Sequence, residues 1–279
     1  MITTHKRLLL FSLTCLAIGF GWFASADANA ASQRLVLTGS STVAPLVGEI
    51  VRKYESMHPG VRIDVQTGGS SRGINDTRNG IADIGMVSRA LKPNEKDLHA
   101  YTIALDGVSV ILHASNPVSV LSKQQIADIY TGKITNWKSV GGADARITVV
   151  NKAEGRSTLE LFLQYFQLKN SQIKPHIIIG DNPQGIKTIT GNPHAVGYVS
   201  IGAAEYEAKR GAPIRLLALD GVDASVAHVH SGAFPLSRPL NLITSHVPQG
   251  LAQHFITFAR SQQTHELVEA QYFVPISAE

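Results

Sequence analysis

Three segments of this chain share one design, in which a predicted strand ends in a glycine-containing turn with hydroxyl side chains and then opens a helix. The turns are Gly39-Ser40-Ser41-Thr42, Gly69-Ser70-Ser71 and Gly155-Arg156-Ser157-Thr158. Strands that alternate with helices indicate parallel pairing and a layered α/β fold. Ligands of open α/β sheets bind at the carboxyl ends of strands, which is where all three turns are expected. One such turn is weak evidence, but three predict a common binding site.

Apolar periodicity predicts the elements around these turns. We expect strands over residues 34–38, 61–65, 81–86, 107–114, 147–150, 177–179, 195–199 and 240–244. We expect helices over residues 43–57, 122–130, 157–166, 184–190, 203–210 and 248–262, and a short helix that starts within the turn after residue 67. Residues 220–231 show no clear pattern, so none is assigned there.

The third turn adds positive charge to a helix start. Lys152 and Arg156 flank it, and a helix start offers unpaired N–H groups and the positive end of a dipole. Ser157 and Glu160 have the spacing of a capping box. Glu154 is expected to pair with Lys152 or Arg156, or to be a surface acid. The turn therefore predicts an anion site, with an ordinary capped turn and solvated cations as the alternative.

The first 30 residues have the pattern of a secretory signal peptide. A charged start is followed by an apolar run over residues 8–24 and by Ala28-Asn29-Ala30, a small-residue cleavage pattern. The single cysteine, Cys15, lies inside this segment, so the mature protein would have no disulfide. Cleavage after Ala30 leaves 23 basic and 20 acidic residues, an excess too small to indicate nucleic-acid binding. We expect a globular protein of the periplasm.

The chain resembles the phosphate-binding periplasmic proteins of phosphate-specific ABC transporters over essentially its whole mature length. Two motifs are specific in this order and spacing, the Gly68-Gly69-Ser70-Ser71 turn and Gly132-Lys133-Ile134-Thr135-Asn136-Trp137. Further matching segments are Gly39-Ser40-Ser41-Thr42, Ala82-Asp83-Ile84-Gly85-Met86-Val87-Ser88-Arg89, Ala195-Val196-Gly197-Tyr198 and Pro235-Leu236-Ser237-Arg238-Pro239-Leu240.

This resemblance implies a two-lobed periplasmic-binding-protein fold of type II. Each lobe would hold a central, mostly parallel sheet flanked by helices, with the ligand in the cleft. Lobe I would comprise residues 31–109 and 236–279, and lobe II residues 110–235. The chain would cross to lobe II near residues 106–112 and return near 234–242.

The resemblance further implies a monomeric solute-binding protein, not an enzyme, that captures inorganic phosphate or a close tetrahedral oxyanion. Hinge closure would seal the anion, and a membrane permease of an ABC importer would receive it. No cofactor and no metal are expected. The predicted ligand contacts are Ser41, Thr42, Ser70, Ser71, Ser88, Lys152, Arg156, Ser157 and Thr158.

Two segments depart from the family pattern. Ser88 stands where some members have an aspartate that accepts the proton of hydrogen phosphate, and a serine does not repel a fully ionised anion such as sulfate. The second segment is the turn whose usual pattern is R-x-x-G-S-G-T. Here Lys152 replaces the arginine, Arg156 replaces the serine and Ser157 replaces the second glycine. Lysine cannot provide the bidentate fork of arginine. We expect that Arg156 restores this fork by contacting the anion, or else fills ligand space so that the ligand differs.

Three alternatives stay open. The segment Gly69-Ser70-Ser71-Arg72-Gly73 matches the G-x-S-x-G pattern of serine hydrolases, which would make Ser71 a nucleophile. His228 and His230 could be metal ligands on one strand face, although surface histidines are commoner. A secreted protein with a lost or changed ligand, acting in adhesion or sensing, would explain the altered turn.

Overall fold

The computed structural model describes residues 33–276. The predicted signal peptide lies outside them. The strands are β1 Gln33–Gly39, β2 Val61–Thr67, β3 Ile84–Val87, β4 His99–His113, β5 Thr148–Lys152, β6 Ile177–Ile179, β7 Ala195–Ser200, β8 Ile214–Leu216, β9 Ser237–Thr244 and β10 Val274–Pro275. The α-helices are α1 Ala44–Met57, α2 Ser70–Arg78, α3 Lys123–Tyr130, α4 Ser157–Phe166, α5 Asn182–Thr190, α6 Ile201–Lys209, α7 Val226–His230, α8 Gly250–Ala259 and α9 His265–Ala270.

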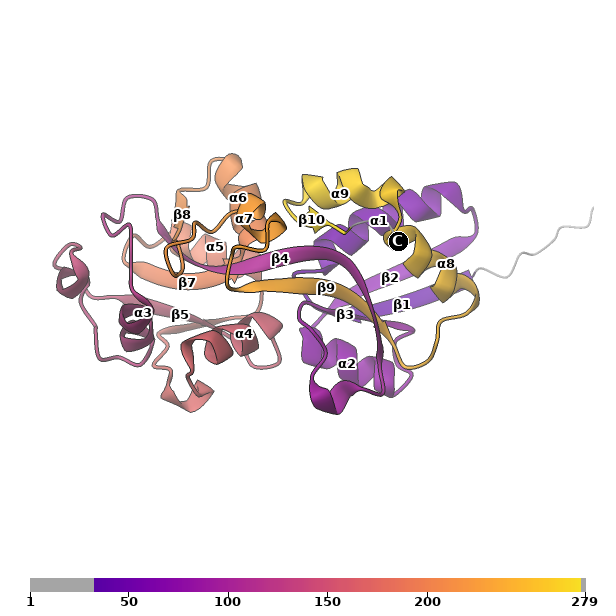
Figure 1. The fold of residues 1–279 in the computed structure, drawn as a ribbon, viewed down its shortest axis with the longest axis horizontal. Coiled ribbons are helices and arrows are strands. Elements are labelled where there is room, and N and C mark those ends of the chain that lie inside the picture. The colour runs from indigo at the N-terminus through magenta and orange to yellow at the C-terminus, as the bar shows by residue number, and fades with distance from the viewer. Residues whose placement is uncertain (1–32, 277–279) are drawn as a thin grey trace, which may run out of the picture. The chain divides into compact units, whose positions relative to one another are not determined.

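The strands form one mixed sheet in the order β2-β1-β3-β9-β4-β7-β5-β6, and β8 and β10 pair with β4 in addition. Pairing is parallel on both outer sides, between β1 and its neighbours β2 and β3 and between β5 and its neighbours β6 and β7. It is antiparallel in the middle, where β9 and β4 lie side by side (Figure 1). The predicted α/β class is therefore confirmed, with an antiparallel centre that the local patterns did not indicate.

Strand β4 links two hydrophobic cores. It pairs with β9 from His99 to Gly107 and with β7 from Val108 to Leu112, so its partner changes after Gly107. Core 1 packs α1, α8 and α9 against β1 to β3 and the first part of β4, around residues such as Leu37 and Phe255. Core 2 packs α3 and α4 against β5, β7 and the second part of β4, around Trp137 and Phe162.

The sheet faces opposite core 1 and core 2 are covered by two smaller hydrophobic clusters. A small cluster of Ile74, Val87, Leu98 and Ile243 lies under α2 on the core 1 side. On the core 2 side, α5 and α6 cover β5 and β7 with Ile186, Ile189 and Ala204 among their buried residues. Within residues 33–276, no helix is both long and apolar enough to cross a membrane.

Local chemistry explains several of the element boundaries. The capping box predicted at Ser122 and Gln125 is present, with Gln125 N donating to Ser122 Oγ at 3.1 Å and Ser122 N to Gln125 Oε1 at 2.8 Å. The strand predicted from residue 81 starts only at Ile84, because Ile81 is exposed and the Asp83 carboxylate accepts a hydrogen bond from Val36 N at 2.7 Å.

Other predictions needed correction. The strand predicted over residues 107–114 begins at His99, since residues 99–106 pair with β9 across a long sequence separation. Helix α5 starts at Asn182, two residues before the predicted helix 184–190, because Asp181 caps it and Pro183 is compatible with a first turn. The unassigned segment contains α7, and β8, β10 and α9 also went unpredicted.

Core 2 should depend strongly on its aromatic centre. Phe162 stacks on Tyr198 with ring centroids 4.0 Å apart and packs against Tyr130 at 4.6 Å. We predict that Phe162→Ala lowers the free energy of unfolding by about 3–5 kcal/mol, because a buried aromatic ring leaves a cavity. Urea denaturation of the purified protein measures this. As a control, Ile178→Ala removes an exposed side chain and should change the free energy of unfolding by less than about 0.5 kcal/mol. Equal losses in the two variants would contradict the assignment of Phe162 to the core.

Candidate functional site

The three glycine-containing turns lie at the carboxyl ends of β1, β2 and β5, as predicted, and each precedes a helix. Two glycines are required by close backbone approach. Gly39 has φ +132°, and a Cβ there would lie 2.3 Å from Met86 O. Gly69 has φ +97°, and a Cβ there would lie 2.6 Å from Gly155 O of the third turn. The second and third turns therefore touch, and Ser71 N donates to Gly155 O at 3.2 Å.

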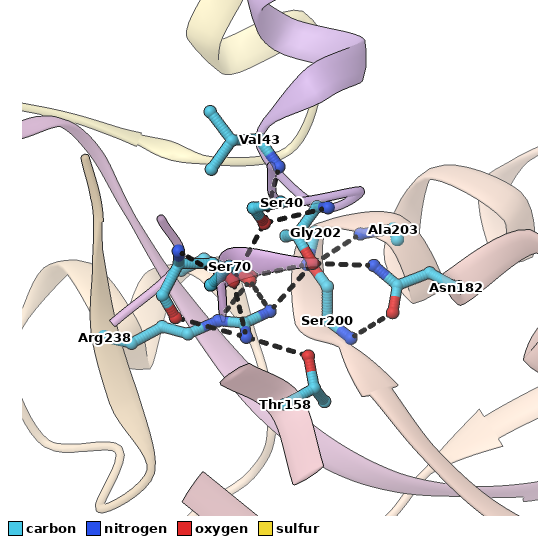
Figure 2. A network of polar contacts seen from close by, with 12 residues as sticks. Ser40, Val43, Ser70, Thr158, Asn182, Ser200, Gly202, Ala203 and Arg238 are labelled. Carbon is cyan, nitrogen blue, oxygen red and sulfur yellow. Dashed lines mark hydrogen bonds and ion pairs between the residues drawn. The ribbon is translucent and has the colours of Figure 1, made fainter. Parts of the chain in front are cut away.

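Arg238 lies at the centre of a buried polar network (Figure 2). Its Nε and Nη2 donate to Asp106 Oδ2 at 3.0 and 2.8 Å, and both side chains are essentially inaccessible to solvent. The two residues are direct neighbours across the β4–β9 ladder. Asp106 Oδ1 also accepts a hydrogen bond from Gly202 N at 3.2 Å, which fixes the carboxylate from the start of α6. The ion pair thus stands where β4 passes from core 1 to core 2.

Hydroxyl groups from both cores converge on the Arg238 guanidinium (Figure 2). Nη1 donates to Thr158 Oγ1 at 2.9 Å and to Ser88 Oγ at 3.4 Å, and Nη2 donates to Thr42 Oγ1 at 3.4 Å. Ser88 is held in turn by Ser40, whose Oγ donates to Ser88 Oγ at 3.0 Å, and by Ser70, whose Oγ accepts from Ser88 N at 3.2 Å. Helix starts on opposite cores thus meet around one cation.

Lys152 brings a second cation into the buried network. Its Nζ donates to Asn182 Oδ1 at 3.0 Å, and Asn182 Nδ2 donates to Thr42 Oγ1 at 3.2 Å. The pKa of Lys152 is lowered to about 7, chiefly by burial and in addition by the charges of Arg238 and Arg156, while Asp181 offsets part of this shift. Lys152 forms no ion pair within residues 33–276. The network therefore carries more positive than negative charge when Lys152 is protonated, which is the electrostatic requirement of an anion site.

Arg156 lies between the second turn and Gly180. A Cβ on Gly69 would lie 2.9 Å from Arg156 Cδ, and one on Gly180 would lie 3.4 Å from its Nη2. Its Nε is buried without a hydrogen-bond partner among the described residues, and so is Ser157 Oγ. Buried donors are normally satisfied, so two unpaired groups next to Lys152 and Thr158 indicate a place where a further acceptor is needed.

The structure joins most of the predicted site residues but not all of them. Thr42, Ser88 and Thr158 contact Arg238 directly, whereas Ser70 and Lys152 join the network through Ser88 and Asn182. Ser41 is half-buried and lines a cavity of about 120 Å³ beside Thr42 and Asn182. The Ser71 side chain faces Glu160 instead, with Oγ 3.5 Å from Glu160 Oε1.

The capping box predicted at Ser157 and Glu160 is wrong. Arg156 occupies the N-cap position of α4 without a side-chain cap, Ser157 is the first helical residue, and its hydroxyl has no partner among the described residues. Glu160 instead forms ion pairs with Arg89 and Lys92. Glu154 contacts neither Lys152 nor Arg156, as its Oε1 accepts from Asn170 Nδ2 at 2.7 Å, so it is the surface acid of the alternative prediction.

Sequence reasoning missed three central residues, Arg238, Asp106 and Asn182. Arg238 was noted only within a family motif, although a charged residue inside an apolar strand is itself a signal, because such a charge needs a buried partner. Asn182 lies just before the predicted helix 184–190 and was not singled out. Asp106 could not be paired with Arg238 from local pattern, since 132 residues separate them.

The metal and hydrolase alternatives find no support in the described residues. His228 and His230 lie on helix α7 and not on a strand, and His228 Nδ1 contacts Ser225 Oγ and Asp223 O. Residues 33–276 contain no cluster of three or more potential metal-binding His, Cys, Asp or Glu side chains. Within the part of the chain that the structure describes, Ser71 has a carboxylate at 3.5 Å and no hydrogen bond to a histidine, so the base expected beside a serine nucleophile is missing there.

Comparison with known proteins decides the family. Residues 24–263 match the model of the PBP superfamily domain. The chain belongs to the PBP superfamily. Family members similar to it include the phosphate-binding protein PstS of Bacillus subtilis, 28% identical over 252 residues, which cover 88% of this chain and 82% of that protein. PstS of Borreliella burgdorferi is 26% identical over 261 residues, covering 89% of this chain and 92% of its own.

Solved structures of this superfamily superpose over most of the chain. One is a candidate phosphate ABC transporter substrate-binding protein with bound phosphate from Clostridium perfringens, with a TM-score of 0.81 and 31% identity, covering 88% of this chain and all of that one. An ABC-type phosphate transport receptor from Vibrio cholerae has a TM-score of 0.70 and 28% identity with the same coverage. The type II fold expected from the resemblance is thereby confirmed.

The Arg238–Asp106 pair gives a direct test of the site's construction. We predict that Asp106→Ala lowers the free energy of unfolding by about 3–5 kcal/mol, because it leaves a buried guanidinium without its carboxylate. Chemical denaturation in an anion-poor buffer measures this. Asp144→Asn, at an exposed ion pair with Lys138, should leave the unfolding midpoint unchanged. A stable Asp106→Ala protein would show that Arg238 is not held as described.

Proposed function

We propose that this protein captures inorganic phosphate and delivers it to an ABC importer. The observation that carries the proposal is the buried network, in which two cations and hydroxyls from both cores converge at the starts of α1, α2 and α4. The phosphate-binding names of the relatives and the bound phosphate of the Clostridium perfringens protein support the choice of ligand. The protein acts by binding and transport, and it is not an enzyme.

The ligand contacts follow from the chemistry of the network. Arg238, Lys152 and Arg156 provide positive charge, and Arg238 joins the contacts predicted from sequence. Hydroxyls are compact donors and acceptors that suit the oxygens of a tetrahedral oxyanion, and they are supplied by Thr42, Ser70, Ser88, Ser157 and Thr158. An anion at this point would accept hydrogen bonds from Ser157 Oγ and Arg156 Nε, which lack partners in the described part of the chain. Ser41 would contribute through its backbone N–H group at the start of α1. Ser71 N already donates to Gly155 O, so Ser71 would position the second turn against the third.

Closure between two lobes is part of the proposal. We place lobe I at residues 31–109 and 236–279, and lobe II at residues 110–235. The change of β4 partner after Gly107 agrees with a hinge at this boundary, since β4 and β9 are the strands that run between core 1 and core 2. Closing the lobes brings Thr42 and Ser88 to Thr158 and Lys152, which would enclose the anion away from water.

Export and delivery complete the proposal. We place the protein in the periplasm, because residues 1–30 have the pattern of a signal peptide that would be cleaved on export. A monomer is part of this proposal. A membrane permease would receive the loaded, closed form. If titration showed no bound oxyanion, the altered turn with Lys152 and Arg156 would instead favour a secreted protein that has lost its ligand and acts in adhesion or sensing.

Isothermal titration against phosphate, sulfate, arsenate and molybdate tests the ligand. We predict that ligand-stripped protein binds phosphate tightly, and that Arg156→Ala weakens binding at least about tenfold, or 1.4 kcal/mol, because a charge-assisted hydrogen bond is lost. Arg72→Ala is the matched control, since Arg72 is exposed and already paired with Asp76. An unchanged affinity in Arg156→Ala would remove Arg156 from the site. Tight sulfate binding instead of phosphate would overturn the choice of ligand.

Lys152 should couple binding to proton uptake. The pKa of Lys152 is about 7 in this structure, and a bound anion would raise it, so at pH 8 binding should protonate Lys152. The affinity contribution of this charge is therefore fully present below pH 7 and is lost as pH rises through the higher pKa of the complex.

Titration in two buffers with different ionisation enthalpies counts the protons. We expect about one proton more to be taken up by the natural protein than by Lys152→Arg, whose guanidinium stays charged. The comparison at equal pH cancels the protons contributed by phosphate itself. Equal uptake by both proteins would mean that Lys152 is already protonated in the free protein or does not meet the anion.

A further inference from the structure

Glu160 joins the two cores at a point outside the proposed anion site. It lies on α4 between Leu159 and Phe162, and those side chains belong to core 2. Its Oε2 is 2.9 Å from Arg89 Nε and 2.8 Å from Lys92 Nζ. Arg89 and Lys92 follow β3, whose residues pack with core 1. The contact is therefore an ion pair between the two halves that would have to separate if the lobes opened.

Arg89 is a fixed platform for this contact. Its Nη1 and Nη2 donate to the two carboxylate oxygens of Glu95 at 2.7 and 2.8 Å, and both side chains are buried. Glu95 is fixed in turn by Lys92 N, which donates to Oε2 at 2.8 Å. A bidentate arginine–carboxylate pair holds the guanidinium in one plane, so that Nε remains turned toward Glu160. Arg89 Nε and Glu160 Oε2 are within the distance of an ion pair, but they are not aligned for a hydrogen bond.

The charges of this cluster balance only when the halves are together. Arg89, Lys92 and Glu95 leave one positive charge on the core 1 side, and Glu160 supplies one negative charge from core 2. Glu160 is a quarter exposed and Arg89 is 5% exposed at the side chain, so the pair is partly shielded from water. Partly buried pairs of this kind are screened less by salt than exposed ones.

The cluster adjoins the turns of the proposed site without being part of it. Ser71, whose backbone N–H meets Gly155 O, also places its Oγ 3.5 Å from Glu160 Oε1. Within residues 33–276, Arg238 forms no hydrogen bond with Glu160, so removal of this carboxylate leaves the hydroxyl network around Arg238 in place. Any effect of a Glu160 substitution on phosphate binding would then arise from a change in lobe closure.

We propose that Glu160, through Arg89 and Lys92, holds the two lobes closed and thereby sets the rate at which the anion is released. The inference rests on the proposed function, since it concerns closure over that ligand. An ion pair that exists only in the closed form raises the closed population and slows opening, and the apparent affinity rises in proportion to that population. Association with the open form does not use the pair, so its rate is unaffected.

The test compares release of radiolabelled phosphate from the natural protein, Glu160→Gln, Lys92→Met and the double variant. We expect Glu160→Gln to release phosphate about tenfold faster with an unchanged association rate. This tenfold loss of affinity corresponds to about 1.4 kcal/mol of binding free energy. Lys92→Met, at an exposed side chain, should release it about two- to threefold faster, since exposed pairs contribute less. In the double variant, the Lys92 substitution should add nothing to the effect of Glu160→Gln.

Matched controls separate the possible failures. Glu154→Gln removes a carboxylate from the turn before α4 that accepts a hydrogen bond from Asn170 on the same side, and it should leave the rate of phosphate release unchanged. If the natural protein binds phosphate but Glu160→Gln and Lys92→Met release it at the natural rate, the inference about Glu160 is overturned and the proposed function stands. Additive effects in the double variant would also overturn it. If the natural protein binds no phosphate, the proposed function itself fails.

Discussion

The buried ion pair between Arg238 and Asp106 is the interaction on which the site depends. A guanidinium that is removed from water costs several kcal/mol unless a carboxylate and further acceptors surround it. The β4–β9 ladder provides the carboxylate by placing the two residues opposite each other, and α6 fixes it through Gly202 N. The remaining N–H groups of Arg238 then point to hydroxyls of Thr42, Ser88 and Thr158. One antiparallel pair thus fixes where the carboxyl ends of β1, β3 and β5 meet.

Lys152 gives this site an electrostatic property that Arg238 does not have. An arginine stays charged at every physiological pH, whereas a buried lysine near another cation can lose its proton. In the free protein the network can therefore reduce its own repulsion by releasing one proton from Lys152. The bonds to Asn182 keep the amine in place in either state. A lysine in place of the usual arginine therefore lets the charge of this network change with pH, which an arginine would not allow.

Much of this arrangement could be predicted from local sequence. The turns at Gly39, Gly69 and Gly155 lie where strand–helix alternation placed them, and the buried positions of Lys152, Thr158 and Ser88 agree with the prediction that they face a site. What was missed depends on distant pairing. No local period reveals that Asp106 and Arg238 are neighbours or that Glu160 contacts Arg89. The capping box at Ser157 failed for the same reason, because a partner from the other core attracts the glutamate that the local motif would use.

The course of β4 and β9 also has a consequence for how the chain reaches this fold. Core 2 is built almost entirely from one continuous stretch, residues 105–236, whereas core 1 needs both residues 35–104 and residues 240–273. Contacts that close long loops form slowly. During synthesis from the amino end, core 2 can assemble before β9 and α8 are available to pack with β1 to β3. A chaperone or protease that acts during this interval would meet the exposed edge of β3, and truncation near the carboxyl end would damage the half that contains the amino end.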